Sequence, residues 1–542
     1  MRNADLDNAP TGLSALWAEV DSATAFAAGY PVDPSLAGKP DERRPAGLRL
    51  AVEGAIAACP PKDELTIATL RSMLTQIDIV APHQAAREGV EWLRALIYRG
   101  LLQSSTARLV VAALVERVDF LGSRYATAPP LQQLLCARDL GALAALAART
   151  GASTLEAAAR RVVSSLDMPA EPQSLANVLT VCAASEDTAL VTAAEHRRLL
   201  VEAFGFEETP SEIAAIAESG IDEELGELRS LGRLVSGGLE LATTALEDVV
   251  SKLEKQRQPA AGRDHLTEAK RQSDLARPLF GARLLTLTPA QRAVVPEQTP
   301  DAMLPLVTEG EEYMVGALSP SPQAFCFITT KQCSDVYTLA NVLFHELAHC
   351  WNMLAAAGAS PTLPAPARAG GPGGKILLEG IAMQREWEIY ALYDESLRAG
   401  ERWEYATIFD DLGATREAAA LEFHLVTRYW RLARYLRALF DVRIHSERQR
   451  YDDFVRELAD RTGLSQKRIH AFCFHFLANP GYAPCYSLGG RKVAALQAES
   501  ASLGLSIPEL NTRLNGIGLV PPAFWRRLLI SAPNGEGATD GY

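Results

Sequence analysis

Apolar residues recur at steps of three and four along most of the chain, which is the spacing of an amphipathic helix that faces a core. Ala and Leu dominate from residue 12 to about 280, and Pro or Gly separates one segment from the next. Residues 222–255, rich in Glu and Leu, form one of the longer examples. The pattern therefore predicts a succession of helices whose role is packing.

The pattern changes near Arg277, where seven prolines fall between residues 278 and 322. An aromatic and β-branched run at residues 324–330 predicts a strand, and helical spacing then returns up to about Leu529. We therefore predict a mostly α, multi-helix fold with two lobes around a cleft and a small β element before the helix that carries the main motif. The predicted divisions are an N-terminal helical scaffold domain over residues 1–280, a catalytic helical domain over 281–530 and a disordered tail over 531–542.

Composition and charge exclude several classes of protein. The 542 residues are 48% hydrophobic and 22% charged, which is typical of globular chains and disfavours disorder, collagen-like repeats and coiled-coil filaments. The formal net charge of −13 predicts that the chain binds no nucleic acid, because a phosphate backbone attracts basic surfaces.

The sequence gives no sign of a membrane segment or of an oxidising compartment. Two uncharged stretches of spanning length, residues 347–367 and 469–490, are both interrupted by Pro and Gly, so neither predicts a membrane helix. The first residues lack the apolar core of a secretory signal. The eight cysteines include no C-x-x-C pair and predict neither a disulfide framework nor a zinc knuckle. We therefore expect a cytoplasmic protein that contacts no membrane.

The motif H-E-x-x-H is the feature of the sequence that most directly indicates chemistry. His345 and His349 lie four residues apart, so both imidazoles leave the same face of a helix and can share one metal ion. Ser334 or Asp335 can cap that helix. Glu346 follows the first histidine, where its carboxylate can accept a proton from a water that zinc activates. Nine histidines in 542 residues make a chance match rare, with roughly 0.02 expected.

The residues around the motif are apolar nearly all round the predicted helix, which indicates that the helix is buried. Two histidines on an ordinary helix are the alternative interpretation. Buried imidazoles and a buried carboxylate are unfavourable, however, unless they are paired or bind a metal. We therefore interpret the motif as a site for Zn²⁺.

A third protein ligand is expected, because a catalytic zinc uses three and leaves one position for water. Glu379 lies 30 residues after the second histidine on a further predicted helix, and Gly380 beside it leaves room where two helices and a metal would crowd. The alternative is a solvated carboxylate that the helix dipole stabilises. Glu386, two turns further on, can accept a hydrogen bond from a ligand imidazole.

Two further segments bear on the site. Residues 355–374 are rich in Gly and Pro and are either a tolerated insertion or a mobile flap beside a cleft. Tyr482 and Tyr486 lie in a loop broken by Gly and Pro, which can aim their hydroxyls at the oxyanion of a hydrolytic intermediate. Tyrosines in such turns also serve simply to pack.

Together, H-E-x-x-H, a later E-G-x-A and P-G-Y-x-x-x-Y near the C-terminus resemble the helical gluzincin zinc metallopeptidases over roughly residues 295–493. That group includes thimet oligopeptidase, oligoendopeptidase F and carboxypeptidase Taq. In its short motifs the sequence is more similar to an uncharacterised bacterial branch that carries E-G-[WI]-A and P-G-x-A-x-x-Y. Residues 1–280 resemble the group only as a helical scaffold.

The resemblance implies a role for each of seven residues. The zinc ligands would be His345, His349 and Glu379, and the general base would be Glu346. Tyr482 and Tyr486 would stabilise the oxyanion, and His475 would bind the substrate. The chain departs from the group's pattern at Ala348, where Gly is usual, and at Gly489, where a further Tyr is usual. The spacing of 30 residues between the second and third ligands is also several residues longer than is usual in the group.

These observations predict a zinc-dependent metallohydrolase, most simply a peptidase that acts on short peptides through a metal-activated water. A zinc enzyme that hydrolyses or transforms a small amide-containing metabolite fits the same residues. A helical binding protein with a relict metal site is a third interpretation, against which the intact Glu346 counts, because a relict needs no base. The pattern does not indicate an oligomeric state.

Overall fold

Helices account for most of the residues that the computed structural model describes, and three short strands among these residues form one small sheet. The structure describes residues 12–38, 44–79, 84–166, 168–169, 172–185, 187–307, 309–330, 333, 335–398 and 404–531. The predicted fold class, mostly α with a small β element before the helix of the main motif, is confirmed.

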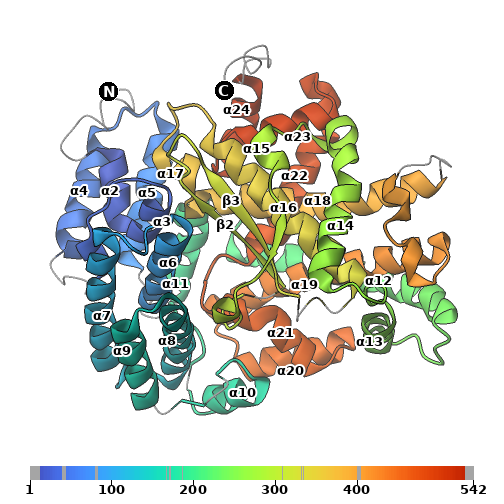
Figure 1. Cartoon of the computed structure of the whole chain (residues 1–542), viewed down its shortest axis with the longest axis horizontal. Coiled ribbons are helices and arrows are strands. Elements are labelled where there is room, and N and C mark those ends of the chain that lie inside the picture. Colours follow the sequence, from blue (N-terminus) through green and yellow to red (C-terminus); the bar gives the residue numbers. More distant parts are fainter. Residues whose placement is uncertain are drawn as a thin grey trace.

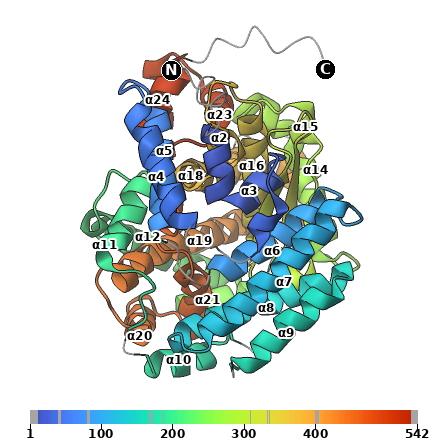
Figure 2. The ribbon, with the colours of Figure 1, turned by 90° about the vertical axis from the view of Figure 1, so that its left-hand side faces the viewer.

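The first half of the chain is the predicted succession of helices, and Figure 1 shows α2 to α9 on one side of the molecule. Many of these helices begin at a residue whose side chain caps the first turn, as Thr209 does for α12 through a reciprocal bond with Glu212. Figure 2 shows α6 to α9 lying beside one another. The helices are α2 (Leu13–Val20), α3 (Ser22–Ala27), α4 (Arg44–Ala58), α5 (Glu64–Asp78), α6 (Gln84–Tyr98), α7 (Ser105–Tyr125), α8 (Pro130–Thr150), α9 (Ser153–Ser165), α10 (Leu175–Ala183), α11 (Ala193–Arg198), α12 (Pro210–Gly238), α13 (Leu246–Gln256) and α14 (His265–Leu279).

The sheet follows the short helix α15 (Pro289–Arg292) and has the strand order β1-β3-β2. Strand β3 (Gln323–Ile328) confirms the strand predicted from the aromatic run. It pairs in parallel with β1 (Pro296–Gln298) and antiparallel with β2 (Gly310–Val315). Strand β2 therefore lies at one edge of the sheet, and Figure 1 shows β2 and β3 against α16.

The second half returns to helices, with α16 at its centre. Nearly every residue of α16 is buried, because β2, β3, α14, α18 and α19 all pack on it. The elements are α16 (Val336–Ala357), α17 (Ala365–Ala369), α18 (Lys375–Arg398), α19 (Arg416–His445), α20 (Tyr451–Thr462), α21 (Gln466–Leu477), α22 (Pro484–Ala498), α23 (Ile507–Gly516) and α24 (Trp525–Ser531).

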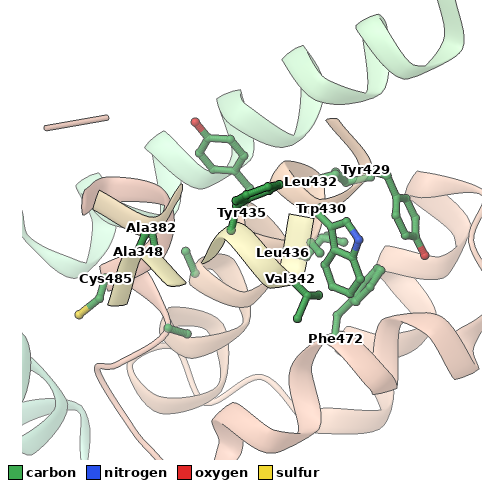
Figure 3. Packing of buried hydrophobic residues seen from close by; sticks show 14 of the residues in the cluster. Val342, Ala348, Ala382, Tyr429, Trp430, Leu432, Tyr435, Leu436, Phe472 and Cys485 are labelled. Atoms are coloured by element: carbon green, nitrogen blue, oxygen red, sulfur yellow. The ribbon is translucent and has the colours of Figure 1, made fainter. Parts of the chain in front are cut away.

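The largest group of buried apolar side chains runs from α8 to α24 and so includes residues on both sides of position 280. Figure 3 shows part of this core, where small residues occur on α16, α18 and α22, namely Ala348, Ala382 and Cys485. The division into domains at 280 stays a prediction. The predicted tail lies, from residue 532 on, outside the described residues.

A cavity of about 780 Å³ lies between the N-terminal helices and the second half of the chain. Helices α3, α5, α6 and α7 line one side of it, and β2, α16, α18, α19, α21 and α22 line the other. We call this space the cleft. None of the described helices combines the length and the apolar composition needed to cross a bilayer.

Candidate metal centre

Helix α16 places the two histidines of the motif on the wall of the cleft. The Asp335 carboxylate accepts hydrogen bonds from the backbone N–H groups of Tyr337 and Thr338, each at 2.9 Å, so it starts the helix as predicted. Ser334, the other predicted cap, lies outside the described residues. The rings of His345 and His349 then lie one turn apart, with centroids separated by 4.5 Å.

Helix α18 brings the third predicted ligand to these histidines. The Oε2 atom of Glu379 lies 3.3 Å from Nε2 of His345 and 3.4 Å from Nε2 of His349. All three residues are buried, and their candidate ligand atoms lie within 4.8 Å of one another. The alternative of a solvated carboxylate at Glu379 is therefore excluded, because only 1% of this residue is exposed.

A second carboxylate on α18 orients the first histidine. The Nδ1 atom of His345 lies 2.7 Å from Oε1 of Glu386, and this same oxygen accepts a hydrogen bond from Nη2 of Arg434 at 2.7 Å. An imidazole that donates its Nδ1–H to a carboxylate presents the lone pair of Nε2 to a metal. Glu386 thus lies where the sequence predicts a supporting carboxylate.

The electrostatics of the cluster favour a cation. Burial raises the pKa of Glu379, but the imidazoles of His349 and His345 outweigh it and hold the pKa well below its usual range. The Oε2 atoms of Glu379 and Glu346 and the Nδ1 atom of His349 are buried without a hydrogen-bond partner among the described residues. Two imidazoles and a carboxylate are the donor set of many catalytic zinc sites, so the residues present fit Zn²⁺.

Glu346 lies between the cluster and the edge strand β2. A Cβ atom at Gly310 would come within 2.7 Å of Val342 Cγ1 and 2.8 Å of Glu346 Cγ, so only glycine allows this close approach. Burial, followed by the charges of Glu312 and Glu379, raises the pKa of Glu346 well above its usual range.

Glu312 is a residue of the site that the sequence analysis missed. Its carboxylate, that of Glu346 and His349 offer ligand atoms within 4.8 Å of one another. Alternate residues of a strand share one face, so a strand predicted at residues 310–315 would have placed Glu312 on the same face as Gly310.

The C-terminal tyrosines both reach the cluster. Tyr482 lies in a turn as predicted, but Tyr486 lies in the first turn of α22, which begins at Pro484, and not in a loop. The Tyr482 hydroxyl donates a hydrogen bond to Oε1 of Glu379, and the Tyr486 hydroxyl donates to that of Tyr482 at 3.4 Å. The ring of Tyr486 is nearly parallel to that of His345, with centroids 5.9 Å apart. The turn that carries Tyr482 is held by Asp441, whose carboxylate accepts a hydrogen bond from the backbone N–H of Gly481 at 2.9 Å.

His475 lines the same cleft but lies apart from this hydrogen-bond chain. Burial, together with the nearby charges of Arg138, Arg87 and Arg437, lowers its pKa to about 3. The imidazole is therefore neutral at physiological pH and can donate one N–H, but it cannot act there as a cation.

The comparison with known families assigns the chain. The family model described as "Bacterial protein of unknown function (DUF885)" matches residues 68–528. The chain belongs to the DUF885 family. No curated protein matches this DUF885 chain.

Two solved structures share the fold of the DUF885 chain. One is described as "the putative lipoprotein from Colwellia psychrerythraea", with a TM-score of 0.63, 14% identity and coverage of 96% of this chain and 98% of that chain. The other is described as "a putative lipoprotein of unknown function from Shewanella oneidensis", with a TM-score of 0.62, 13% identity and coverage of 96% and 99%. At these identities the likeness shows the fold alone.

The predicted resemblance to the helical gluzincin metallopeptidases is wrong as a family assignment. The family that matches most of the chain is DUF885, and the similar structures are described as lipoproteins, not as peptidases. The physical reason is that H-E-x-x-H follows from helix geometry and from the ligands that zinc prefers. Such short motifs carry chemistry without indicating descent.

The glycine-rich segment of the DUF885 chain is built into the cleft wall. Residues 355–374 include α17 and a 3₁₀ turn at Pro372–Gly374, and Gly370 and Gly371 line the cleft. A Cβ atom at Gly374 would lie 2.4 Å from Leu519 Cβ, so this end of the segment is closely packed. The segment is thus positioned beside the site, and its mobility stays a prediction.

Proposed function

We propose that this DUF885 protein is a zinc-dependent hydrolase that cleaves short peptides. The observation that carries the proposal is the convergence of two imidazole nitrogens and one carboxylate oxygen within 4.8 Å, buried on the wall of a cleft. Glu386 and Arg434 support this arrangement through the 2.7 Å contacts to His345 and to each other. An ordinary helix–helix contact would not bury this set of polar groups.

The residues around the cluster suit hydrolysis of an amide. When bound, zinc supplies Lewis-acid chemistry and lowers the pKa of a coordinated water towards ~7. The Glu346 carboxylate is adjacent to the ligands, and its Oε2 atom accepts no hydrogen bond from the residues that the structure describes, so it is available to take the proton of the attacking water. Tyr486 offers an O–H group for the oxyanion that forms on the substrate.

A second candidate, a hydrolase of a small amide-containing metabolite, is favoured by the volume of the cleft. A space of about 780 Å³ lies within the range of roughly 300–1,000 Å³ in which proteins hold small molecules. Digestion of an unbiased peptide library separates the two candidates, because only a peptidase produces new chain ends.

The experiment for the hydrolase is a paired measurement of zinc content and turnover. We expect about one zinc per chain, and loss of that zinc in a His345→Ala, His349→Ala double variant. Glu346→Gln should keep the zinc and lower kcat by about 100- to 10,000-fold, because an amide cannot accept the proton. Glu227→Gln, on the exposed face of α12, is the matched control. Full zinc in the double variant, or normal turnover in Glu346→Gln, would contradict the proposal.

We propose the cytoplasm as the compartment in which the protein works. All eight cysteines are buried free thiols, which supports a reducing environment. The descriptions of the two similar structures as lipoproteins apply to those proteins. Cell fractionation tests the proposal, and recovery of the chain with the membranes would overturn it.

A further inference from the structure

Among the described residues, six Arg and Lys side chains line the cleft, and five of them have a carboxylate partner. The five ion pairs are Arg87 with Glu91, Arg94 with Glu311, Arg117 with Glu88, Lys375 with Glu312 and Arg434 with Glu386. Arg437 is the sixth. In the part of the chain that the structure describes, no carboxylate forms an ion pair with it.

Arg437 is also deeply buried, with only 4% of the residue exposed. Its Nε donates to the backbone carbonyl of Phe472 at 2.9 Å, and its guanidinium lies 4.6 Å from the ring centroid of Phe476 and 5.7 Å from that of Tyr486. Phe472 belongs to the core seen in Figure 3. These contacts fix the stem of the side chain and face its cation with aromatic rings, but they supply no negative charge.

The charges around Arg437 are mixed, and none of those that the structure describes pairs with it. Burial and then the neighbouring Arg434 lower the pKa of the Arg437 guanidinium, whereas Glu309, which lines the same cleft, acts in the opposite direction. His475 nearby is neutral, so it can donate a hydrogen bond without adding a further cation. A buried guanidinium without a counter-ion is unfavourable, and a carboxylate is the group whose geometry matches its paired N–H donors.

A carboxylate bound by Arg437 would lie close to the predicted zinc ligands, because the Tyr486 ring lies between Arg437 and His345. The Tyr486 ring contacts the Arg437 guanidinium on one hand and stacks on the His345 ring, 5.9 Å away, on the other. An anion bound by Arg437 therefore lies one aromatic ring away from the predicted zinc ligands.

We propose that Arg437 binds the carboxylate of the substrate, and that this carboxylate is the free C-terminus of a short peptide. The proposal rests on the proposed peptidase function and deepens it. It makes the enzyme a C-terminal exopeptidase, since the anchored chain end fixes which amide bond lies at the zinc ligands.

Binding of three fluorescent peptides to zinc-loaded Glu346→Gln protein tests the proposal without turnover. The peptides are dansyl-Ala-Ala-Phe-Ala as the free acid, the same peptide as the C-terminal amide, and an amide whose last residue is Glu. We expect the free acid to bind about 10- to 100-fold more tightly than its amide, which is the typical weight of a charge-assisted hydrogen bond.

Variants of Arg437 then assign the effect. Added to Glu346→Gln, Arg437→Gln should remove the preference for the free acid and Arg437→Lys should restore part of it. The matched control Arg491→Gln, at an exposed position on α22, should keep all of it. Zinc content and the circular dichroism spectrum show that each variant folds.

Four results would overturn the proposal. Equal affinity for the free acid and its amide, in the Glu346→Gln protein that keeps Arg437, would exclude a carboxylate subsite. Cleavage of both peptides by the wild-type chain would then still support the peptidase function. Equal affinity for the free acid and the Glu-containing amide would assign the subsite to an acidic side chain instead of the chain end. A full preference for the free acid in the folded Arg437→Gln variant would move the subsite elsewhere. Failure of all three peptides to bind or be cleaved would remove the proposed function as well.

Discussion

The hydroxyl of Tyr482 carries a single proton, and the structure commits that proton to Oε1 of Glu379. The Tyr482 hydroxyl therefore orients Glu379, a predicted zinc ligand, in addition to any contact that it makes with substrate. Tyr486 donates to the oxygen of Tyr482 at the long distance of 3.4 Å, which makes a weak hydrogen bond. Little free energy is therefore lost when the Tyr486 O–H group turns to donate to an oxyanion instead. The resemblance gives the two tyrosines the same role, whereas their hydrogen bonds indicate different ones.

Phenylalanine variants separate these roles. Tyr482→Phe should weaken zinc binding by about 10- to 100-fold, because a supporting hydrogen bond to a ligand is lost. Tyr486→Phe should keep the zinc and lower kcat by about 100- to 1,000-fold with little change in KM, because the lost donor acts mainly in the transition state. Zinc titration and steady-state kinetics measure the two effects. Unchanged kcat in Tyr486→Phe would leave this tyrosine a packing role.

At the scale of single residues, the sequence predicts a site residue when its spacing from another site residue along one helix brings the two side chains together. His345 and His349 are brought together by one turn of helix, so their partnership is visible in five letters. Arg437 is one of several arginines on α19, and nothing local shows that Arg434 forms an ion pair while Arg437 forms none with the described residues. That difference depends on α18, which is distant in the sequence, and only the folded chain reveals it.

Among the elements, the crossing of α18 and α22 sets the position of Glu379. A Cβ atom at Gly380 would lie 2.6 Å from the carbonyl carbon of Gly489, and one at Gly489 would lie 2.4 Å from the carbonyl oxygen of Ile376. The crowding predicted at Gly380 is therefore between two backbones rather than with a metal. Gly489, noted in the sequence for lacking a tyrosine, has no room for any side chain.

Alanine at Gly380 should disturb this crossing. We expect the free energy of unfolding to fall by about 1–3 kcal/mol from overpacking, and zinc affinity to fall with it because Glu379 is the adjacent residue. The control is Gly226→Ala on α12, where a Cβ meets nothing within 4 Å and should stabilise the chain by up to about 1 kcal/mol. Urea denaturation and zinc titration measure both. A Gly380→Ala protein as stable as Gly226→Ala would contradict the close crossing.

Strand β2 shows why the sheet was only partly predicted. The β3 segment is rich in aromatic residues and was found, whereas β2 reads Gly-Glu-Glu-Tyr-Met-Val and begins with the residues that usually avoid strands. Its extended form comes from pairing with β3 and from the need for Gly310 beside Glu346. Tertiary contacts outweigh local preference at this edge.

Across the whole molecule, a buried ion pair joins the N-terminal helices to the sheet. Arg94 of α6 donates two hydrogen bonds, each of 2.9 Å, to the Glu311 carboxylate of β2. Only 3% of the Arg94 side chain is exposed. The pair closes the cleft wall across more than two hundred residues of sequence, which no local pattern could have shown.

Removing Arg94 should loosen this junction. Arg94→Ala leaves the Glu311 carboxylate without its partner, and we expect a loss of about 3–5 kcal/mol in the free energy of unfolding. Arg160→Ala, which breaks the exposed pair with Glu156 on α9, should cost about 0.5 kcal/mol or less. Chemical denaturation compares the two variants. Equal losses would mean that the Arg94 pair does not join the two sides of the cleft.

Three buried residues of α19 lie on one face at successive turns, and each serves a different neighbour. Arg434 contacts Glu386, Arg437 faces the cleft, and Asp441 holds the loop before Tyr482. One residue inserted between them would rotate the following part of the helix by about 100° and misplace Arg437 or Asp441 relative to Arg434. Insertions and deletions can therefore be tolerated at the two ends of α19 but not between residues 434 and 441. The number of residues in this stretch is fixed, because it sets the relative positions of all three side chains.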